Sequence, residues 1–188
     1  AYNLTCLGLK NSQITYKKSK IGNSLSDIVA LKIIKNLNKK KIKVLDFFPS
    51  GSDERQYCSQ GYNLPMGVFM RGVPGKYREY HTSLDSLGKV VTSNGLEGSF
   101  NTIKLCLEAI EKNFYPKSIY LGEPQLGKRG LYSGFGKKSV QKNSKLILDF
   151  LTWSDRNHSL IDIAEKLTIP VWELYSIVEV LKKNRLIK

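Results

Sequence analysis

The first 140 residues combine short strand-like runs with two stretches of helical periodicity. Runs rich in apolar and β-favouring residues at 2–8, 13–16, 42–48 and 63–71 predict strands. Between them, residues 25–37 carry Ile28, Leu31 and Ile34 at helical spacing, and Ser24 stands where a helix N-cap is expected. Residues 99–113 show the same spacing. This mixture of strands and helices predicts an α/β sheet, in which ligand sites gather at strand ends.

From residue 142 onward the pattern predicts three helices. The first covers 146–153, Ser159 caps the second, and Pro170 opens the third. The second and third carry apolar residues at i, i+3 or i+4, and i+7, namely Leu160, Ile163, Ala164 and Leu167, then Val171, Leu174, Val178 and Leu181. A short helix, a turn and a longer helix predict a helix-turn-helix, after which 184–188 could begin a wing strand. We therefore expect an α/β part over 1–118, a Gly/Pro-rich linker over 119–140 and a winged-helix-like module over 141–188.

Charge is unevenly distributed over these parts. The chain of 188 residues has a net charge of +14, with 22 basic and 10 acidic residues before position 141 and 8 and 6 after it. Lysines account for 24 of the 30 basic residues, whereas arginine is favoured for base readout and bidentate phosphate contacts. A lysine-rich solvated surface is therefore the preferred interpretation, and attraction to nucleic acid or anionic surfaces is the alternative.

The cysteines and the apolar runs argue against a disulfide-rich, secreted or membrane-spanning protein. The 3 cysteines are far apart and have no CxxC spacing, which argues against a disulfide framework or a zinc knuckle and favours buried thiols. The chain lacks both a run of 18 apolar residues and a secretory-type N-terminal pattern, so we expect a cytoplasmic protein without a membrane partner. Because Ala1 leads directly into a strand-like segment, we expect a fragment of a longer protein.

The candidate chemistry lies in two loops of the α/β part. Asp53, Glu54 and Arg55 follow the predicted strand 42–48, and His81 follows a turn at 73–76. Taken alone, the first group suggests a solvated turn with an internal ion pair, and an isolated histidine is usually a surface residue. Arg55 could instead clamp a substrate carboxylate.

Two sets of motifs indicate a family. Ser52-Asp53 together with YHTSLD at 80–85 resembles the C-terminal half of the co-catalytic zinc aminopeptidases. More closely, four segments in order resemble an aminopeptidase-like family of unassigned substrate, associated with polysaccharide-biosynthesis loci and carrying a winged-helix module: SDERQYCS at 52–59, NLP at 63–65, EYHTS at 79–83 and QLGKRG at 125–130. The resemblance implies part of a phosphorylase/hydrolase-like α/β/α sandwich that holds two zinc ions and hydrolyses a peptide or amide bond.

The resemblance also assigns roles to particular residues. His81 matches the family's zinc-binding histidine, and a carboxylate such as Glu79 or Asp85 could fix its tautomer. Asp53 matches an aspartate beside the metal centre, and Glu54 stands where the aminopeptidases have histidine, so both are candidate catalytic residues. Arg55 and Tyr80 are the candidate substrate contacts.

Departures from the family pattern limit this assignment. The His-x-Asp motif, the bridging aspartate and the glutamate general base are not found. The strand at 4–9 has no aspartate, so its expected carboxylate ligand is either replaced by Cys6 or absent. We therefore expect zinc only in the intact protein, with a peptide-like or amide substrate, and expect this chain to need the N-terminal part of the same protein as its partner.

Two non-enzymatic alternatives remain open, a degenerate homologue kept for interaction and a nucleic-acid-binding module. The third C-terminal helix would expose two acidic residues toward phosphates, which favours a packing or protein-contact role over DNA binding. Its expected exposed positions are Glu173, Ser176, Glu179, Lys182 and Lys183. A homo-oligomer is compatible with the sequence.

Overall fold

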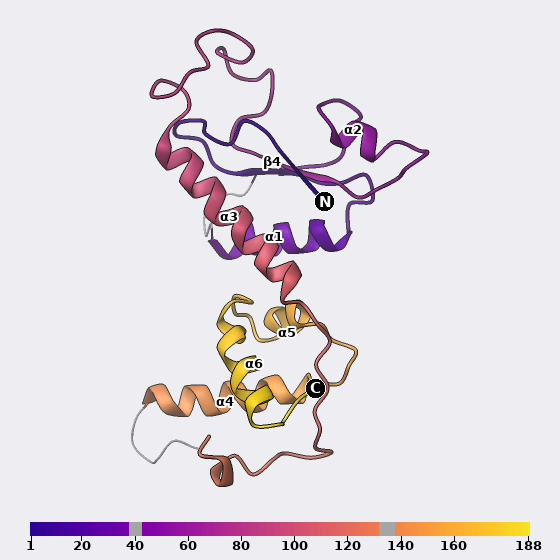
Figure 1. Ribbon diagram of the computed structural model, residues 1–188, viewed down its shortest axis with the longest axis vertical. Coiled ribbons are helices and arrows are strands. Elements are labelled where there is room, and N and C mark those ends of the chain that lie inside the picture. The colour runs from indigo at the N-terminus through magenta and orange to yellow at the C-terminus, as the bar shows by residue number, and fades with distance from the viewer. Residues whose placement is uncertain (38–42, 132–137) are drawn as a thin grey trace. The chain divides into compact units, whose positions relative to one another are not determined.

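The computed structural model describes residues 1–37, 43–131 and 138–188. Contacts between residues divide the chain into two units, 1–110 and 111–188 (Figure 1). The division falls eight residues before the boundary expected at 118. Each unit is described by itself.

The N-terminal unit is built on a sheet of four short strands: β1 (Tyr2–Leu4), β2 (Thr15–Lys17), β3 (Lys43–Leu45) and β4 (Gly67–Met70). Their spatial order is β1-β4-β2-β3. The outer pairs β1·β4 and β2·β3 are parallel, and the central pair β2·β4 is antiparallel, with Tyr16 opposite Phe69. The expected α/β class is confirmed, and the sheet is mixed.

The strands are shorter than the apolar runs that predicted them, for local backbone reasons. Cys6 has φ 49°, a left-handed conformation that ends β1. In the run 63–71, Asn63 has φ 47° and Pro65 lacks a backbone N–H, so pairing begins only at Gly67. Hydrophobicity predicted the position of each strand, whereas backbone conformation decided its length.

Helices α1 (Leu25–Leu37) and α3 (Ser93–Glu111) lie on one side of the sheet (Figure 1). The rings of Tyr2 and Tyr16 each lie 5.0 Å from that of Phe69. The hydroxyl group of Tyr2 donates to the carbonyl of Ser26 in α1 at 2.8 Å. These three aromatic side chains therefore form the core between the sheet and α1.

Helix α1 has the predicted bounds but turns a different face inward. The predicted cap at Ser24 is confirmed. The Ser24 Oγ accepts a hydrogen bond from the backbone N–H of Asp27 at 3.4 Å, and the backbone N–H of Ser24 donates to the Asp27 carboxylate at 3.1 Å. The buried apolar residues are Val29, Ala30, Ile33 and Ile34. Ile28, expected on the inner face, is 37% exposed.

Asp27 joins α1 to β2 through a buried hydrogen-bond network. Its side chain is 0% exposed and accepts hydrogen bonds from the hydroxyl groups of Tyr16 (2.8 Å), Ser19 (2.6 Å) and Ser24 (2.6 Å). The backbone N–H of Ser19 also donates to it, at 2.8 Å. Burial alone would raise the pKa of the Asp27 carboxyl, but these donors outweigh it and lower the pKa.

The opposite face of the sheet carries Lys17, Val68 and Met70, by the alternation of side chains along β2 and β4. The short helix α2 (Glu54–Tyr57) lies on this side of the sheet (Figure 1). We expected a loop there, and four helical residues are too few to give a periodic signal. This face holds the cavity in which the candidate chemistry gathers.

The C-terminal unit has the expected winged-helix organisation. Helices α4 (Lys138–Thr152), α5 (Leu160–Lys166) and α6 (Glu173–Lys183) follow a 3₁₀ turn, η1 (Gly127–Arg129). Ser159 and Asp162 form a reciprocal capping box at α5, as the pattern predicted for Ser159. The predicted apolar residues of the third helical segment, Val171, Leu174, Val178 and Leu181, are all buried.

The wing of this unit is formed by residues that lie far apart in the sequence. Ser118 pairs antiparallel with Ile187, and Lys117 pairs with Asp155. Pro124 and Leu126 are buried. Thus residues 111–131 fold with the C-terminal unit, although 119–140 was expected to be a linker; residues 132–137 of that range lie outside the described residues.

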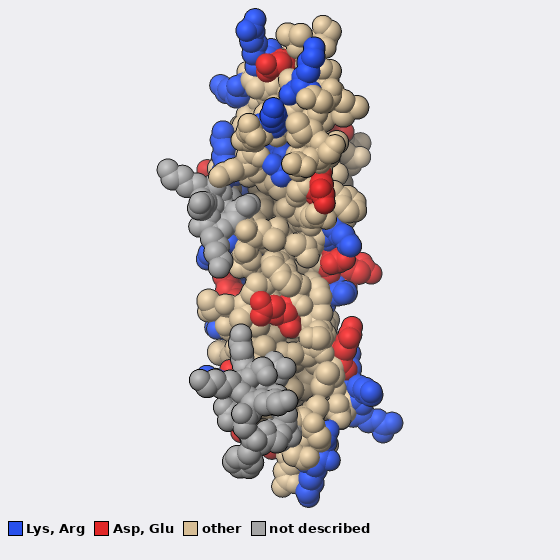
Figure 2. Space-filling view, turned by 90° about the vertical axis from the view of Figure 1, so that its left-hand side faces the viewer, with Lys and Arg blue, Asp and Glu red and all other residues tan. Residues whose placement is uncertain are grey.

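The surface carries scattered charge on the face shown in Figure 2. Lys and Arg side chains there alternate with uncharged residues and some acidic ones, without one continuous basic patch. Among the helices that the structure describes, none has the length and apolar character needed to cross a membrane.

Candidate functional site

A cavity of about 560 Å³ on the α2 side of the sheet brings together three of the predicted site residues. Glu54, Tyr80 and His81 line it, together with Lys17 from β2. Its walls come from the loop at 50–52, strand β4 and the turn at 73–75. The two loops that carried the candidate motifs therefore meet over one face of the sheet.

The floor of this cavity contains a buried ion pair between Lys17 and Glu54. The Lys17 Nζ lies 2.8 Å from the Glu54 Oε1, and the two side chains are 2% and 3% exposed. Lys17 also donates to the carbonyl of Ser50 at 2.7 Å, and its ammonium lies 3.8 Å from the ring centroid of Phe48. Lys17 was not predicted as a site residue, because it follows the predicted strand 13–16 directly and begins a polar run, whereas the structure includes it in β2.

Glu54 is held by several further donors. Its Oε2 accepts from the side-chain amide of Asn3 at 2.7 Å and from the backbone N–H of Ser52 at 3.2 Å. Burial by itself would raise the pKa of the Glu54 carboxyl, but the hydrogen bonds from Lys17 and Asn3 lower it. An ionised carboxylate with this many donors anchors the loop at 50–54 and is poorly placed to accept a substrate proton.

His81 lies at the mouth of the cavity with its imidazole accessible. It has φ 60°, and its ring stacks on that of Tyr80 at 4.0 Å between centroids and 16° between planes. In the described part of the chain, no side chain or backbone group forms a hydrogen bond with its ring nitrogens, and the residue is exposed. Both nitrogens are therefore free to bind a ligand.

The carboxylate expected to orient His81 has another partner. The phenol of Tyr77 donates to Asp85 Oδ2 at 3.1 Å and lies 3.3 Å from the Cys6 Sγ. Burial, Cys6 and Asp85 together raise the pKa of Tyr77. The backbone carbonyl of Glu79 accepts hydrogen bonds from the hydroxyl and the backbone N–H of Thr82.

Asp53 and Arg55 are exposed and do not line the cavity. Adjacent helical residues point about 100° apart, so α2 turns Glu54 inward and its two neighbours outward. Asp53 occupies the N-cap position without a side-chain capping bond. Arg55 forms no ion pair with any acidic residue in the described ranges, so the internal pair considered for this turn is not formed.

The side chains of this chain do not by themselves fit a zinc centre. Within the described residues, no group of three or more His, Cys, Asp or Glu side chains is close enough to share a metal ion. A catalytic zinc generally has three protein ligands, and a two-metal site needs more. Here His81 contributes one imidazole, and Cys6 is engaged with Tyr77.

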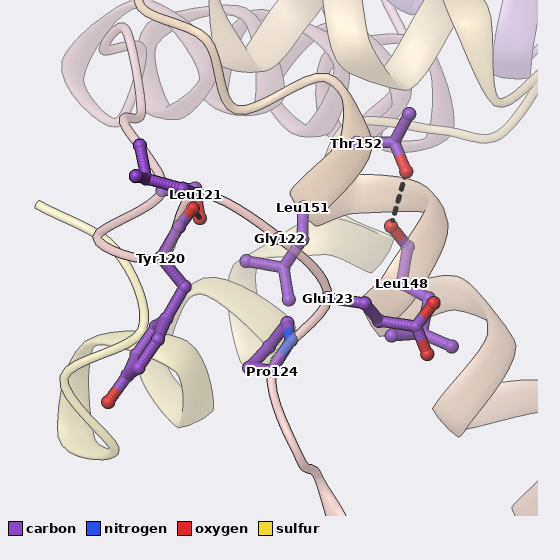
Figure 3. Close-up of a pocket in the computed structure, with 9 residues that line it drawn as sticks. Tyr120, Leu121, Gly122, Glu123, Pro124, Leu148, Leu151 and Thr152 are labelled. Atoms are coloured by element: carbon purple, nitrogen blue, oxygen red, sulfur yellow. Dashed lines mark hydrogen bonds between the residues drawn. The ribbon is translucent and has the colours of Figure 1, made fainter.

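A cavity in the C-terminal unit offers less chemistry. It measures about 280 Å³ and lies between the 118–124 segment and the end of α4 (Figure 3). Thr152 donates to the carbonyl of Leu148 at 2.9 Å. The described residues of the lining include one carboxylate, Glu123, and no histidine, cysteine or lysine. The site on the sheet of the N-terminal unit is therefore the stronger candidate.

Comparisons with known proteins agree with the two-unit organisation. Residues 1–113 match the family described as "Domain of unknown function (DUF4910)", and residues 113–188 match the family described as winged helix-turn-helix. A Clostridium acetobutylicum protein named "Putative polysaccharide biosynthesis protein with aminopeptidase-like domain" is 39% identical over 171 residues, which cover 86% of this chain and 37% of that protein.

A solved structure extends the likeness to three dimensions. A crystal structure of a "putative peptidase" from Clostridium acetobutylicum covers 100% of this chain with a TM-score of 0.85 and 32% sequence identity. The chain covers 41% of that structure. It thus spans about two fifths of the length of these relatives.

Proposed function

The chain belongs to the DUF4910 family, and from its site and its relatives we propose that it forms part of an aminopeptidase-like hydrolase that cleaves a peptide or amide bond with zinc. The observation that carries the proposal is the meeting of Glu54, Tyr80 and His81 in one cavity over the sheet. The likeness to a protein named for an aminopeptidase-like domain, and to a structure described as a peptidase, supports it.

Each residue of the cavity has a distinct proposed task. His81 presents free ring nitrogens at the mouth, which suits a zinc ligand. Lys17 and Glu54 hold the loop at 50–54 against β2 and so shape the floor. Tyr80 stacks on His81, which fixes the position of the imidazole and leaves its phenol edge for substrate contact. Asp53 and Arg55 do not line the cavity, so we propose for them no direct contact with the reacting bond.

The remaining ligands and the general base must come from elsewhere, because this chain supplies one accessible imidazole. We propose that they come from the portion of the relatives' length that this chain does not span. The chain alone is then expected to be catalytically inert.

A chimera tests this proposal. In the Clostridium acetobutylicum relative, this chain would replace the segment that it matches. The chimera is expected to release ammonia from amino-acid amides only with zinc. His81→Ala is expected to lower this activity more than about 100-fold, since loss even of groups behind the metal ligands costs about 10- to 100-fold.

Matched variants separate metal binding from damage to the fold. His158→Ala removes the other histidine, which pairs with Asp155 in the C-terminal unit, and is expected to leave activity and zinc content unchanged. The isolated chain should bind less than one equivalent of zinc by elemental analysis. Turnover by the chain alone, or full activity in His81→Ala, would contradict the proposal.

For the C-terminal unit we propose a packing or protein-contact role in preference to DNA binding. The exposed residues of α6 include Glu173 and Glu179 at the start and middle of the helix, and lysines only at its end. In a helix-turn-helix the N-terminal part of the second helix enters the major groove, where the Glu173 carboxylate would be repelled by the DNA phosphates.

Binding to duplex DNA is expected to be weak and insensitive to α6. At physiological salt, the dissociation constant should stay in the non-specific range of about 10⁻⁴ to 10⁻⁶ M. The double change Glu173→Gln/Glu179→Gln should alter the dissociation constant for DNA no more than Glu97→Gln/Glu108→Gln on α3 does, as measured by fluorescence anisotropy. Selective tightening by the α6 changes would show that this helix faces DNA.

A further inference from the structure

A second cavity in the N-terminal unit, of about 420 Å³, is lined by basic and neutral side chains, with no Asp or Glu among the described residues that line it. Arg71, Lys43 and Lys76 supply three positive charges. It lies where β4 ends and where β2 and β3 begin, and it shares only Val73 with the candidate hydrolase site. Its chemistry is therefore distinct from that of the cavity around His81.

Arg71 is fixed in place by neutral groups. Its Nε donates to the Oγ of Ser99 at 2.8 Å, and its Nη1 donates to the carbonyl of Ser12. The Ser99 hydroxyl in turn donates to the carbonyl of Leu7 at 2.7 Å, so the guanidinium is held between α3 and the loop before β2. A guanidinium held by its Nε and one Nη keeps its other donors in a fixed orientation.

The charge of Arg71 has no counter-ion in the described part of the chain. The residue is partly buried, and burial lowers its pKa, yet no carboxylate lies within ion-pair distance. Partly desolvated charges are costly unless they are paired. Two of the five guanidinium N–H groups are engaged, which leaves three for a ligand.

The backbone of α3 makes room for this guanidinium. A Cβ added at Gly98 would lie 2.4 Å from the Nη2 of Arg71. A glycine in the interior of a helix is otherwise unfavourable by about 1 kcal/mol relative to alanine. The position of Arg71 thus depends on a close approach that only glycine allows.

Lys43 and Lys76 add two exposed ammonium groups at the same cavity, and neither forms an ion pair with a described acidic residue. Asn11 and Gln13 add neutral amide donors. One carboxylate would balance one of the three cations, whereas a phosphate group carries close to two charges and offers several acceptor oxygens.

We propose that this cavity binds a phosphate group, with Arg71 as the fixed donor fork and Lys43 and Lys76 as point charges. The inference does not rest on the proposed hydrolase activity, because binding can be measured without turnover.

Calorimetric titration of the full chain with inorganic phosphate, at an ionic strength held constant with chloride, tests the proposal. Lys43→Gln/Lys76→Gln should weaken phosphate binding by at least about tenfold, the loss expected for one charge-assisted hydrogen bond. The matched change Lys20→Gln/Lys89→Gln removes two exposed lysines that line neither this cavity nor the one around His81, and should leave the affinity within about twofold.

Two further measurements keep the test decisive. Arg71→Lys removes the fork but keeps a charge, and Gly98→Ala displaces the guanidinium; both should weaken phosphate binding while circular dichroism shows a folded protein. If Arg71→Lys fails to fold, the exposed lysine variants still decide the outcome. Absence of phosphate binding, acetate binding as tight as that of phosphate, or equal loss in the Lys20/Lys89 variant would overturn the proposal.

Discussion

Replacing Glu54 with glutamine is expected to lower the free energy of unfolding of the N-terminal unit by about 3–5 kcal/mol. The change leaves the Lys17 ammonium, 2% exposed, without its carboxylate partner 2.8 Å away. For a unit of this size, that loss corresponds to a melting temperature lower by about 10–20 °C. Chemical denaturation and differential scanning calorimetry would measure both quantities.

A neighbouring surface pair provides the control. Lys18 and Asp46 lie 2.9 Å apart, but their side chains are 30% and 89% exposed. Asp46→Asn should therefore change stability by less than about 1 kcal/mol. Lys17→Met/Glu54→Leu, which removes both charges, should recover much of the loss, because paired burial of ions is often no better than apolar packing. Similar effects at Glu54 and Asp46 would mean that the Lys17–Glu54 pair is solvated.

Replacing Asp27 with asparagine is expected to cost about 3 kcal/mol or more. The carboxylate accepts from Tyr16, Ser19 and Ser24, and an amide nitrogen in place of one oxygen would face donors with another donor. Asp53→Asn is the matched change at an exposed site without a capping bond, and should be nearly neutral. Equilibrium denaturation of the two variants distinguishes these expectations.

The same carboxylates should give the fold an acid limit. The folded-state pKa values of Asp27 and Glu54 are both lowered, so the unfolded chain binds more protons in acid. Their contribution to the free energy of unfolding is fully present above the unfolded pKa values, which are near 4. It is lost as pH falls through the lower folded-state pKa values. The loss of stability below about pH 4 should be shallower in Asp27→Asn than in the unchanged protein. Equal pH dependence in the two would show that the pKa of Asp27 does not differ between the folded and the unfolded chain.

These expectations also change the interpretation of Glu54. The motif at 52–59 made Glu54 a candidate catalytic residue, and in the structure it lines the same cavity as His81. Its carboxylate, however, is engaged by Lys17, Asn3 and Ser52. Loss of hydrolase activity in a Glu54 variant would therefore have to be separated from loss of the loop at 50–54, by measuring stability on the same sample.

Local periodicity was sufficient for features that depend on neighbours in the sequence. It predicted α1 with its bounds and its cap at Ser24, and the buried residues of the third C-terminal helical segment. It also predicted the positions of the strands and the mixed α/β and winged-helix classes. These features follow from side-chain spacing and capping chemistry, which act over a few residues.

Tertiary structure decided everything that depends on contacts between distant residues. The sequence determined that 50–55 and 79–83 carry chemistry-bearing residues, but not that Glu54 points inward while Asp53 and Arg55 point outward. The partners of Glu54 and Ser118 lie 37 and 69 positions away, in Lys17 and Ile187. Local periodicity cannot predict such pairings, because a strand or loop has the same periodicity whichever distant segment it contacts. Packing alone therefore buried Lys17, left Arg71 without a counter-ion among the described residues and brought His81 to the mouth of the cavity.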